Sequence, residues 1–335
     1  MGLDLSVQIG KIKLKNPVLV ASGTFGHAKE FEGFFDLKKL GGIVTKTITL
    51  KPRLGNPPPR VVETPAGMLN AIGLQNPGVE KFIDEKMPYF RKLGIPILVS
   101  VMGYSVGEFV QVVEKLDKAG GMDGFELNLS CPNVPYASKS ENLSLVKIRH
   151  KASADSSTKP ADGFANASWR MFAHDDKMIE EVVSAVRQVT DKTLIAKLGP
   201  DVSDIAKMAS AAERAGADAV SLINTFMAMV IDVKSRRPVL GNKTGGLSGP
   251  CIRPIAVRMT WESAKKVKIP VLGMGGIMNS DHALEFLMAG ASAVQVGTAN
   301  FINPQAPMDI LEGIEEFMKK EKIGKLREII GSVKI

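Results

Sequence analysis

The chain has 335 residues, of which 44% are hydrophobic and 23% charged, an ordinary composition for a globular protein with a sizeable core. Its net charge of +8 permits an anionic partner, but the basic clusters are short and aromatic residues reach only 6%, so nucleic-acid binding is not expected. The sequence has no run of about 18 apolar residues, so a membrane span is not expected. It shows no signal peptide and contains only two cysteines, too few for a disulfide framework, which favours the cytoplasm.

The first predicted element is a β-hairpin over residues 5–15, which turns at Gly10-Lys11 and would cap the amino-terminal face of the fold. Short apolar segments then alternate with amphipathic helical patterns, which indicates βα units and a parallel sheet. Strands are predicted at residues 17–22, 42–47, 96–101, 124–129, 193–198, 217–223, 270–274 and 293–297. Helices are predicted at residues 76–93, 105–119, 177–190, 204–215, 250–267, 280–289 and 308–321. Because eight strands with crossovers favour a closed sheet, the sequence predicts one (β/α)8 TIM-barrel domain over residues 1–335.

Two segments interrupt this alternation. Residues 49–76 are rich in Pro and Gly and are predicted to form a long functional loop. Residues 135–170 follow the fourth strand and contain few apolar residues, which predicts a mobile insertion in the active-site loop. This insertion is either a tolerated surface feature or a modified lid or docking surface for a partner.

Polar residues gather at the carboxyl ends of the predicted strands, where barrels carry their active sites. The two lysines among them, Lys46 and Lys197, either extend from the barrel rim or contact an anion. Lys197 lies in an otherwise apolar strand, where a charge is costly without an anionic partner, so we expect a ligand to supply that partner. The other residues at these ends are Ser22, Thr47, Asn128, Cys131, Asn224 and Thr225.

Glycines follow the last two strands, where barrels commonly bind phosphate through backbone N–H groups. Gly275-Gly276 and Gly297-Thr298 occupy these places, and Gly249 ends a further glycine loop that leads into a helix. Either these glycines only form tight turns, or they let the backbone approach a phosphate. The paired placement favours a phosphate-containing ligand.

Cys131 follows the fourth strand and is flanked by Asn128 and Asn133, whose amides suit the edge of a polar heterocycle. A lone cysteine is often only a small buried residue rather than a catalyst. Cys251 starts a predicted helix without such polar neighbours and is interpreted as structural. The four histidines show neither metal-ligand spacing nor a triad pattern, so no metal site is predicted.

Taken together, these motifs resemble the dihydroorotate dehydrogenase family, and within it the catalytic subunit of class 1 type B. The resemblance covers essentially the whole chain except residues 135–170. Its motifs are Ala21-Ser22-Gly23, Thr45-Lys46-Thr47-Ile48-Thr49, Asn70-Ala71-Ile72-Gly73-Leu74-Gln75-Asn76-Pro77-Gly78, Asn128-Leu129-Ser130-Cys131-Pro132-Asn133-Val134, Lys197, Asn224-Thr225, Gly246-Leu247-Ser248-Gly249, Gly275-Gly276 and Gly297-Thr298.

The resemblance implies an FMN cofactor and oxidation of dihydroorotate to orotate in pyrimidine biosynthesis. It assigns Cys131 as the base that removes the C5 proton while a hydride leaves C6 for the flavin, and Lys197 as a stabiliser of negative charge on the reduced ring. The implied FMN-binding residues are Ser22, Lys46, Thr47, Ser100, Asn128, Lys197, Ile223, Gly249, Gly275, Gly276, Gly297 and Thr298. The implied substrate-binding residues are Lys46, Asn70, Ala71, Ile72, Gly73, Leu74, Asn128, Asn133, Asn224 and Thr225.

The subclass implies a homodimer joined in a heterotetramer to a partner subunit that carries FAD and a [2Fe-2S] cluster and passes electrons to NAD⁺. The chain departs from the family pattern at Ser100, where asparagine is more usual, at Gly199, where serine is usual, and in the 135–170 insertion. Two alternatives stay open: a dehydrogenase of dihydrouracil or dihydrothymine, and a barrel that binds FMN or phosphate ligands without turnover.

Overall fold

A computed structural model describes residues 2–130 and 172–334 of the chain. Cys131, Asn133 and the predicted insertion at 135–170 lie outside the described residues. Within them, eight parallel strands close into a barrel in the order β10-β15-β16-β3-β4-β7-β8-β9, which confirms the predicted fold class. The barrel strands are β3 (Val18–Val20), β4 (Gly42–Val44), β7 (Ile97–Val101), β8 (Gly124–Asn128), β9 (Thr193–Leu198), β10 (Ala219–Leu222), β15 (Val271–Met274) and β16 (Ala293–Val296).

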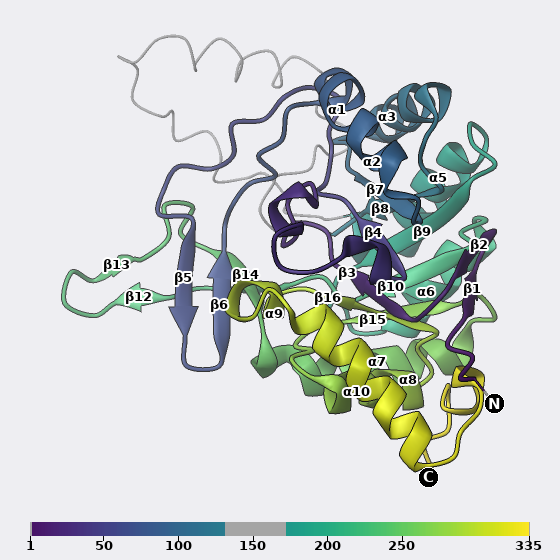
Figure 1. The fold of residues 1–335 in the computed structure, drawn as a ribbon. Coiled ribbons are helices and arrows are strands. Elements are labelled where there is room, and N and C mark those ends of the chain that lie inside the picture. The colour runs from purple at the N-terminus through teal and green to yellow at the C-terminus, as the bar shows by residue number, and fades with distance from the viewer. Residues whose placement is uncertain (1, 131–171, 335) are drawn as a thin grey trace, which may run out of the picture.

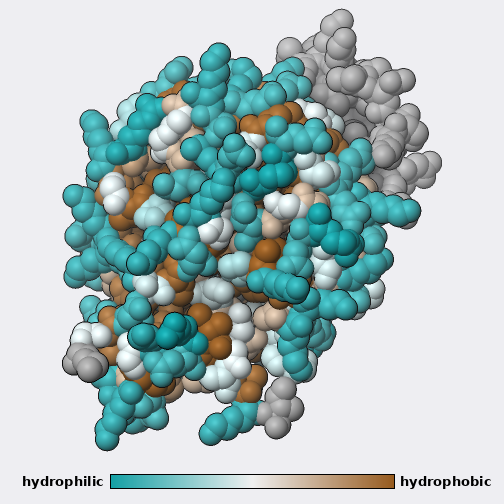
Figure 2. All heavy atoms as spheres, turned by 90° about the vertical axis from the view of Figure 1, so that its right-hand side faces the viewer, coloured by the Kyte–Doolittle hydropathy of each residue, from teal (hydrophilic) through white to brown (hydrophobic). Residues whose placement is uncertain are grey.

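Every residue of these eight strands is buried, because one face fills the barrel interior and the other packs against the surrounding helices. The α-helices are α1 (Val79–Glu85), α2 (Met87–Leu93), α3 (Val106–Ala119), α5 (Asp176–Arg187), α6 (Ile205–Arg214), α7 (Arg253–Lys266), α8 (Ser280–Met288), α9 (Ala299–Ile302) and α10 (Ala306–Lys320). Helices α3, α5, α6 and α8 each begin at a side chain that caps a free backbone N–H, namely Ser105, Asp175, Asp204 and Asn279. The helical ring surrounds the barrel in Figure 1. The face in Figure 2 is mostly hydrophilic, as expected for amphipathic helices that turn their apolar sides inward.

The amino-terminal hairpin consists of β1 (Val7–Ile9) and β2 (Ile12–Leu14), which pair antiparallel. Its turn contains Gly10 with φ 54°, and a Cβ there would lie 2.7 Å from the Cβ of Asp218. The backbone N–H of Lys11 donates to the Thr193 hydroxyl at 3.0 Å. Since Thr193 begins β9 and Asp218 precedes β10, the hairpin lies at the amino-terminal ends of these barrel strands.

One predicted helix differs from the structure. The single helix expected at residues 76–93 is two helices, α1 and α2, because Pro88 has no amide hydrogen to continue the first one. Between β3 and β4, where no helix was predicted, the chain forms the short 3-10 turns η1 (Lys29–Phe31) and η2 (Leu37–Lys39).

The segment at residues 49–76 is more than a loop. It contains the hairpin β5 (Val61–Thr64) and β6 (Gly67–Asn70), which pairs with β14 (Gly245–Ser248) and β11 (Phe226–Ala228) in a four-stranded sheet. Between β11 and β14 the chain forms a smaller hairpin of β12 (Ile231–Asp232) and β13 (Arg237–Pro238). Both hairpins project from the barrel in Figure 1. The remaining 3-10 turns are η3 (Phe172–His174), η4 (Pro250–Ile252) and η5 (Leu326–Glu328).

Candidate active site

A pocket of about 390 Å³ opens at the carboxyl ends of the barrel strands. Its volume lies within the range of about 300–1,000 Å³ that is usual for ligand and cofactor sites. Met68 and Asn70 of β6 and Ser248 of β14 contribute to its lining, so the outer sheet forms one of its walls. A larger hollow of about 490 Å³ lies at the opposite end, near Lys11 and Thr193, and contains none of the predicted site residues.

Most of the predicted site residues line the first pocket, although their sequence positions span almost 280 residues. Ser100 does not line it but is buried and bonded to a residue that does. Ala71 is fully buried in a small apolar cluster with Leu69 and Leu240. The predicted residues that line the pocket are Ser22, Lys46, Thr47, Asn70, Ile72, Gly73, Leu74, Asn128, Lys197, Ile223, Asn224, Thr225, Gly249, Gly275, Gly276, Gly297 and Thr298.

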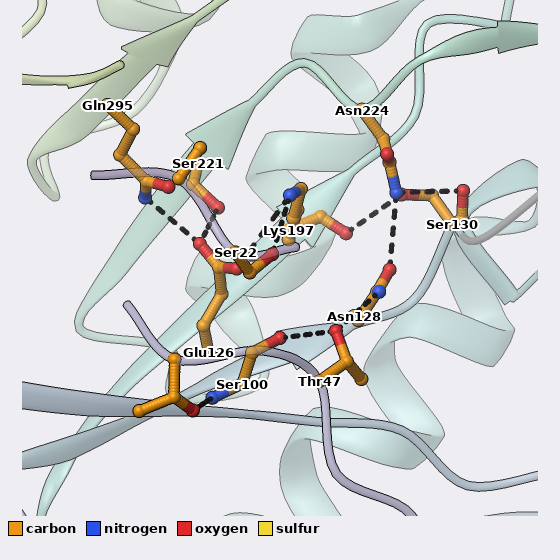
Figure 3. Close-up of polar contacts among 12 residues, drawn as sticks. Ser22, Thr47, Ser100, Glu126, Asn128, Ser130, Lys197, Ser221, Asn224 and Gln295 are labelled. Atoms are coloured by element: carbon orange, nitrogen blue, oxygen red, sulfur yellow. Dashed lines mark hydrogen bonds and ion pairs between the residues drawn. The ribbon is translucent and has the colours of Figure 1, made fainter. Parts of the chain in front are cut away.

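One wall of the pocket carries a network of neutral polar side chains (Figure 3). The amide of Asn128 donates to the Thr47 hydroxyl at 3.2 Å, and that hydroxyl lies 2.9 Å from the hydroxyl of Ser100. The Asn224 amide donates to the side-chain oxygen of Asn128 at 3.2 Å and to the carbonyl of Ser130 at 3.0 Å. These bonds fix the two asparagines at the start of the segment that leads to Cys131.

Lys197 provides a buried positive charge next to Asn128, since the two residues are paired in register between β8 and β9. Its ammonium donates to the Ser22 hydroxyl at 3.1 Å. It also lies 3.9 Å from Oε1 of Glu126, a carboxylate that is completely buried inside the barrel. The protein itself therefore supplies one anionic neighbour of Lys197, in addition to the ligand that was expected to supply one.

Glu126 belongs to a polar set that was not predicted from the sequence. Its Oε2 accepts hydrogen bonds from the Ser221 hydroxyl and from the Gln295 amide, both at 3.0 Å. Each of the three polar side chains interrupts a mostly apolar strand. Glu126 lies two residues before the end of β8, and Ser221 and Gln295 lie one residue before the ends of β10 and β16. A polar residue within an apolar strand was the sequence signal from which this buried polar set could have been predicted.

The glycines around the pocket divide into two kinds. Gly275, Gly276 and Gly249 have φ values of 127°, 70° and 101°, and a Cβ at each would come within 3.0 Å of a neighbouring atom. Packing alone therefore explains glycine at these three positions. A Cβ at Gly297 would meet only the Cβ of Ala21, at an ordinary 3.6 Å, and at Gly23 it would meet nothing within 4 Å. At Gly297 and Gly23 the missing side chain leaves room on the pocket side.

The outer sheet and the glycine loops add further polar groups. The Asn70 amide donates to the carbonyl of Gly246 at 3.4 Å, which ties β6 to β14. The Thr298 hydroxyl donates to the Ser248 hydroxyl at 2.9 Å. The backbone N–H of Thr225 bonds to the Asn224 side-chain oxygen at 2.9 Å, which sets the amide orientation.

Burial shifts the pKa of three titratable groups that do not line the pocket. Burial lowers the pKa of His27, which lies near Lys46, and lowers that of His174 in η3. Burial raises the pKa of Asp201 against the opposing effects of the Met227 backbone N–H and of His174. Among residues 2–130 and 172–334, no group of three or more His, Cys, Asp and Glu side chains has the arrangement of a metal site.

A closed (β/α)8 barrel with a polar pocket of ligand size at its strand ends has the architecture of barrel enzymes. In the parts of the chain that the structure describes, no helix has the length and apolar character needed to cross a membrane. A family model described as dihydroorotate dehydrogenase matches residues 4–161 and 165–318. The chain belongs to the dihydroorotate dehydrogenase family.

Its similarity to individual relatives extends over nearly the full length of both chains. It is 47% identical over 330 residues to a protein of Geotalea uraniireducens, which covers 98% of each chain. It is 48% identical over 330 residues to a protein of Thermodesulfovibrio yellowstonii, and 46% identical over 333 residues to one of Thermoanaerobacter, with at least 98% of each chain covered. All three relatives are named dihydroorotate dehydrogenase B (NAD(+)), catalytic subunit.

Proposed function

We propose that this chain oxidises dihydroorotate to orotate in pyrimidine biosynthesis, with FMN as its cofactor. The observation that carries the proposal is the convergence of Lys46, Lys197, Asn128 and Asn224 on one pocket in a member of this family. The ammonium groups suit the carboxylate of the substrate and an electron-rich ring, and the amides suit the edge of a pyrimidine.

The pocket fits FMN on two counts. Its volume is that of a cofactor site, and the space left by the absent side chain of Gly297 lies beside the last barrel strand, where barrels bind phosphate. When bound, FMN supplies the hydride acceptor for the reaction. The residues that would hold it are Ser22, Lys46, Thr47, Ser100, Asn128, Lys197, Ile223, Gly249, Gly275, Gly276, Gly297 and Thr298.

The chain's own residues then have separate tasks. Asn128 and Asn224 hold the pyrimidine in one orientation, because their amides are themselves fixed by hydrogen bonds. Lys197 supplies fixed positive charge in a site with little water, where such charge has its greatest effect. Cys131 removes the substrate proton, since a thiol with a reference pKa of about 8.5 needs little perturbation to act as a base near neutral pH.

The substrate would be held from several sides of the pocket. Asn70 is fixed to β14 on the outer sheet, and Lys46 would pair with the substrate carboxylate. That charge favours dihydroorotate over dihydrouracil and dihydrothymine, which have no carboxylate. The complete proposed substrate set is Lys46, Asn70, Ala71, Ile72, Gly73, Leu74, Asn128, Asn133, Asn224 and Thr225.

We further propose a homodimer in the cytoplasm that joins a subunit with FAD and a [2Fe-2S] cluster, through which NAD⁺ is reduced. The printed name of the relatives, a catalytic subunit of an NAD⁺-dependent enzyme, supports a partner chain. Large apolar side chains on the projecting hairpin also support it, since Met229, Ile231 and Val233 are 48%, 54% and 84% exposed. Co-purification of a flavin and iron–sulfur protein with the tagged chain tests this assignment.

The proposed reaction is tested on the purified protein without oxygen. The protein should be yellow, and dihydroorotate should bleach its flavin absorbance, whereas dihydrouracil should leave it unchanged. A protein that binds no FMN after reconstitution would contradict the cofactor assignment. Bleaching by dihydrouracil at an equal rate would instead favour a dihydropyrimidine dehydrogenase.

A further inference from the structure

The barrel interior contains a carboxylate that lies behind the pocket instead of lining it. Glu126 is 0% exposed, while its neighbours Lys197 and Gln295 both reach the pocket. Glu126 and Asn128 are two residues apart on β8, so both side chains point into the barrel, one below the other. Glu126 therefore lies one step deeper than the groups that would touch a ligand.

The three residues of this polar set come from alternate strands. Glu126, Ser221 and Gln295 lie on β8, β10 and β16, the fourth, sixth and eighth barrel strands in chain order. Alternate strands of such a barrel contribute one layer of interior side chains, and that layer is usually apolar. Here Ser221 and Gln295 both donate to a single oxygen of Glu126, as Figure 3 shows.

The other oxygen of this carboxylate faces the ammonium. Oε1 of Glu126 accepts no hydrogen bond from any described residue, and Nζ of Lys197 is 3.9 Å away. A buried ammonium with no anion nearby tends to lose its proton, because desolvation disfavours the charged form. Ser22 is neutral, and Lys46, the other lysine that lines the pocket, has the same charge as Lys197. Among the described contacts of Lys197, Glu126 is thus the group that stabilises its charge.

We infer that Glu126 is a positioning residue: its buried carboxylate keeps the Lys197 ammonium charged and in place at the pocket. Lys197 would then carry its charge before any electron reaches the site, as a preorganised electrostatic group must. The inference rests on the proposed function insofar as the pocket holds a flavin. The contact between Glu126 and Lys197 is independent of that assignment.

The test follows the proton on Lys197 directly. Protein labelled with ¹³C at the lysine Cε is titrated by NMR, and the Lys197 signal is identified by its loss in Lys197→Arg. Glu126→Gln keeps the size of the side chain and removes its charge. In this variant the Lys197 signal should titrate at a pH about one unit or more below that of the parent, which corresponds to a tenfold loss of proton affinity. Glu126→Met removes the same charge and replaces Glu126→Gln in the titration if the glutamine variant does not fold.

Two variants are controls. Glu126→Asp keeps the charge, and Ser221→Ala removes only a neutral hydrogen bond to the same carboxylate, so both should titrate as the parent does. If Glu126 merely fills the barrel layer, Glu126→Gln will unfold more easily while the Lys197 signal titrates as in the parent. That result would overturn the inference.

A second readout uses the flavin-loaded protein. In Glu126→Gln, Lys197 should take up a proton when the flavin is reduced. The equilibrium constant for flavin reduction then changes tenfold more per pH unit than in the parent, which is equivalent to about 30 mV in the potential of a two-electron couple. An unchanged pH dependence of the potential over the pH range in which Lys197 titrates in that variant would contradict the inference. A protein that dihydroorotate does not reduce would contradict the proposed function alone, because the lysine titration is also measured without flavin.

Discussion

Thr47 and Thr260 are two buried threonines that should respond in opposite ways to the same substitution. Thr47 is 3% exposed, and its hydroxyl is bonded to the hydroxyl of Ser100 at 2.9 Å and to the amide of Asn128 at 3.2 Å. Thr260 in α7 is 0% exposed, and its hydroxyl has no hydrogen-bond partner among the described residues. Valine replaces each hydroxyl by a methyl group of similar size.

Thr47→Val leaves two buried groups each short of one bond, at a net cost of about 1 kcal/mol per bond or about 2 kcal/mol in total. Thr260→Val removes an unpaired buried hydroxyl and should raise the free energy of unfolding by about 1 kcal/mol. The assay is equilibrium unfolding in urea, where a slope of roughly 3 kcal/mol/M would separate the two midpoints by about 1 M. A Thr260→Val protein that loses as much stability as Thr47→Val would refute the reasoning, because hydrogen bonding would not be what distinguishes the two sites.

Other predictions concern the glycines and a histidine. Gly276→Ala should lose about 1–2 kcal/mol of stability in thermal unfolding, because φ is 70° and a Cβ would lie 2.6 Å from the carbonyl of Gly249. Gly297→Ala should fold as the parent does but bind FMN at least tenfold more weakly in a fluorescence titration; unchanged affinity would remove Gly297 from the cofactor site. Burial lowers the pKa of His27 below its ordinary 6.5, so the neutral form is favoured in the folded state and stability is lost as the pH falls from 6.5 towards the folded-state pKa. His27→Gln should therefore lose less stability than the parent between about pH 7 and pH 5 in thermal unfolding, and equal losses would contradict this assignment.

The barrel was predictable because its signals are local. Runs of buried apolar residues such as those of β7 and β9 identify a strand without reference to any other part of the chain. The outer sheet was not predictable, because β6 pairs with β14 across more than 170 residues and neither strand shows a strong alternation of buried and exposed residues. The break between α1 and α2 had a local signal in Pro88 that the apolar periodicity on both sides obscured.

Residues of the candidate site were predictable from the sequence where they lie at the end of a strand. Residues that lie deeper in the barrel interior were less predictable. Asn128, Lys197 and Asn224 follow the rule that barrel sites form at strand ends. Glu126 also stands out in its strand, but its partners on β10 and β16 are 95 and 169 residues away. Their meeting depends on the closure of the barrel. Gly199, a departure from the family pattern, is explained by the structure, because a Cβ there would lie 2.9 Å from that of Ser130.

The most direct test of the account is the rate at which dihydroorotate reduces the bound flavin in anaerobic stopped-flow mixing, compared between the parent and Cys131→Ala. Removal of a general base is worth about 10²–10⁴-fold, so the variant should stay yellow and bleach at least 100-fold more slowly. Cys131 lies outside the described residues, and its role as the base is the prediction under test. Equal rates in the two proteins would contradict that role, and a parent flavin that dihydroorotate does not bleach would contradict the proposed reaction itself.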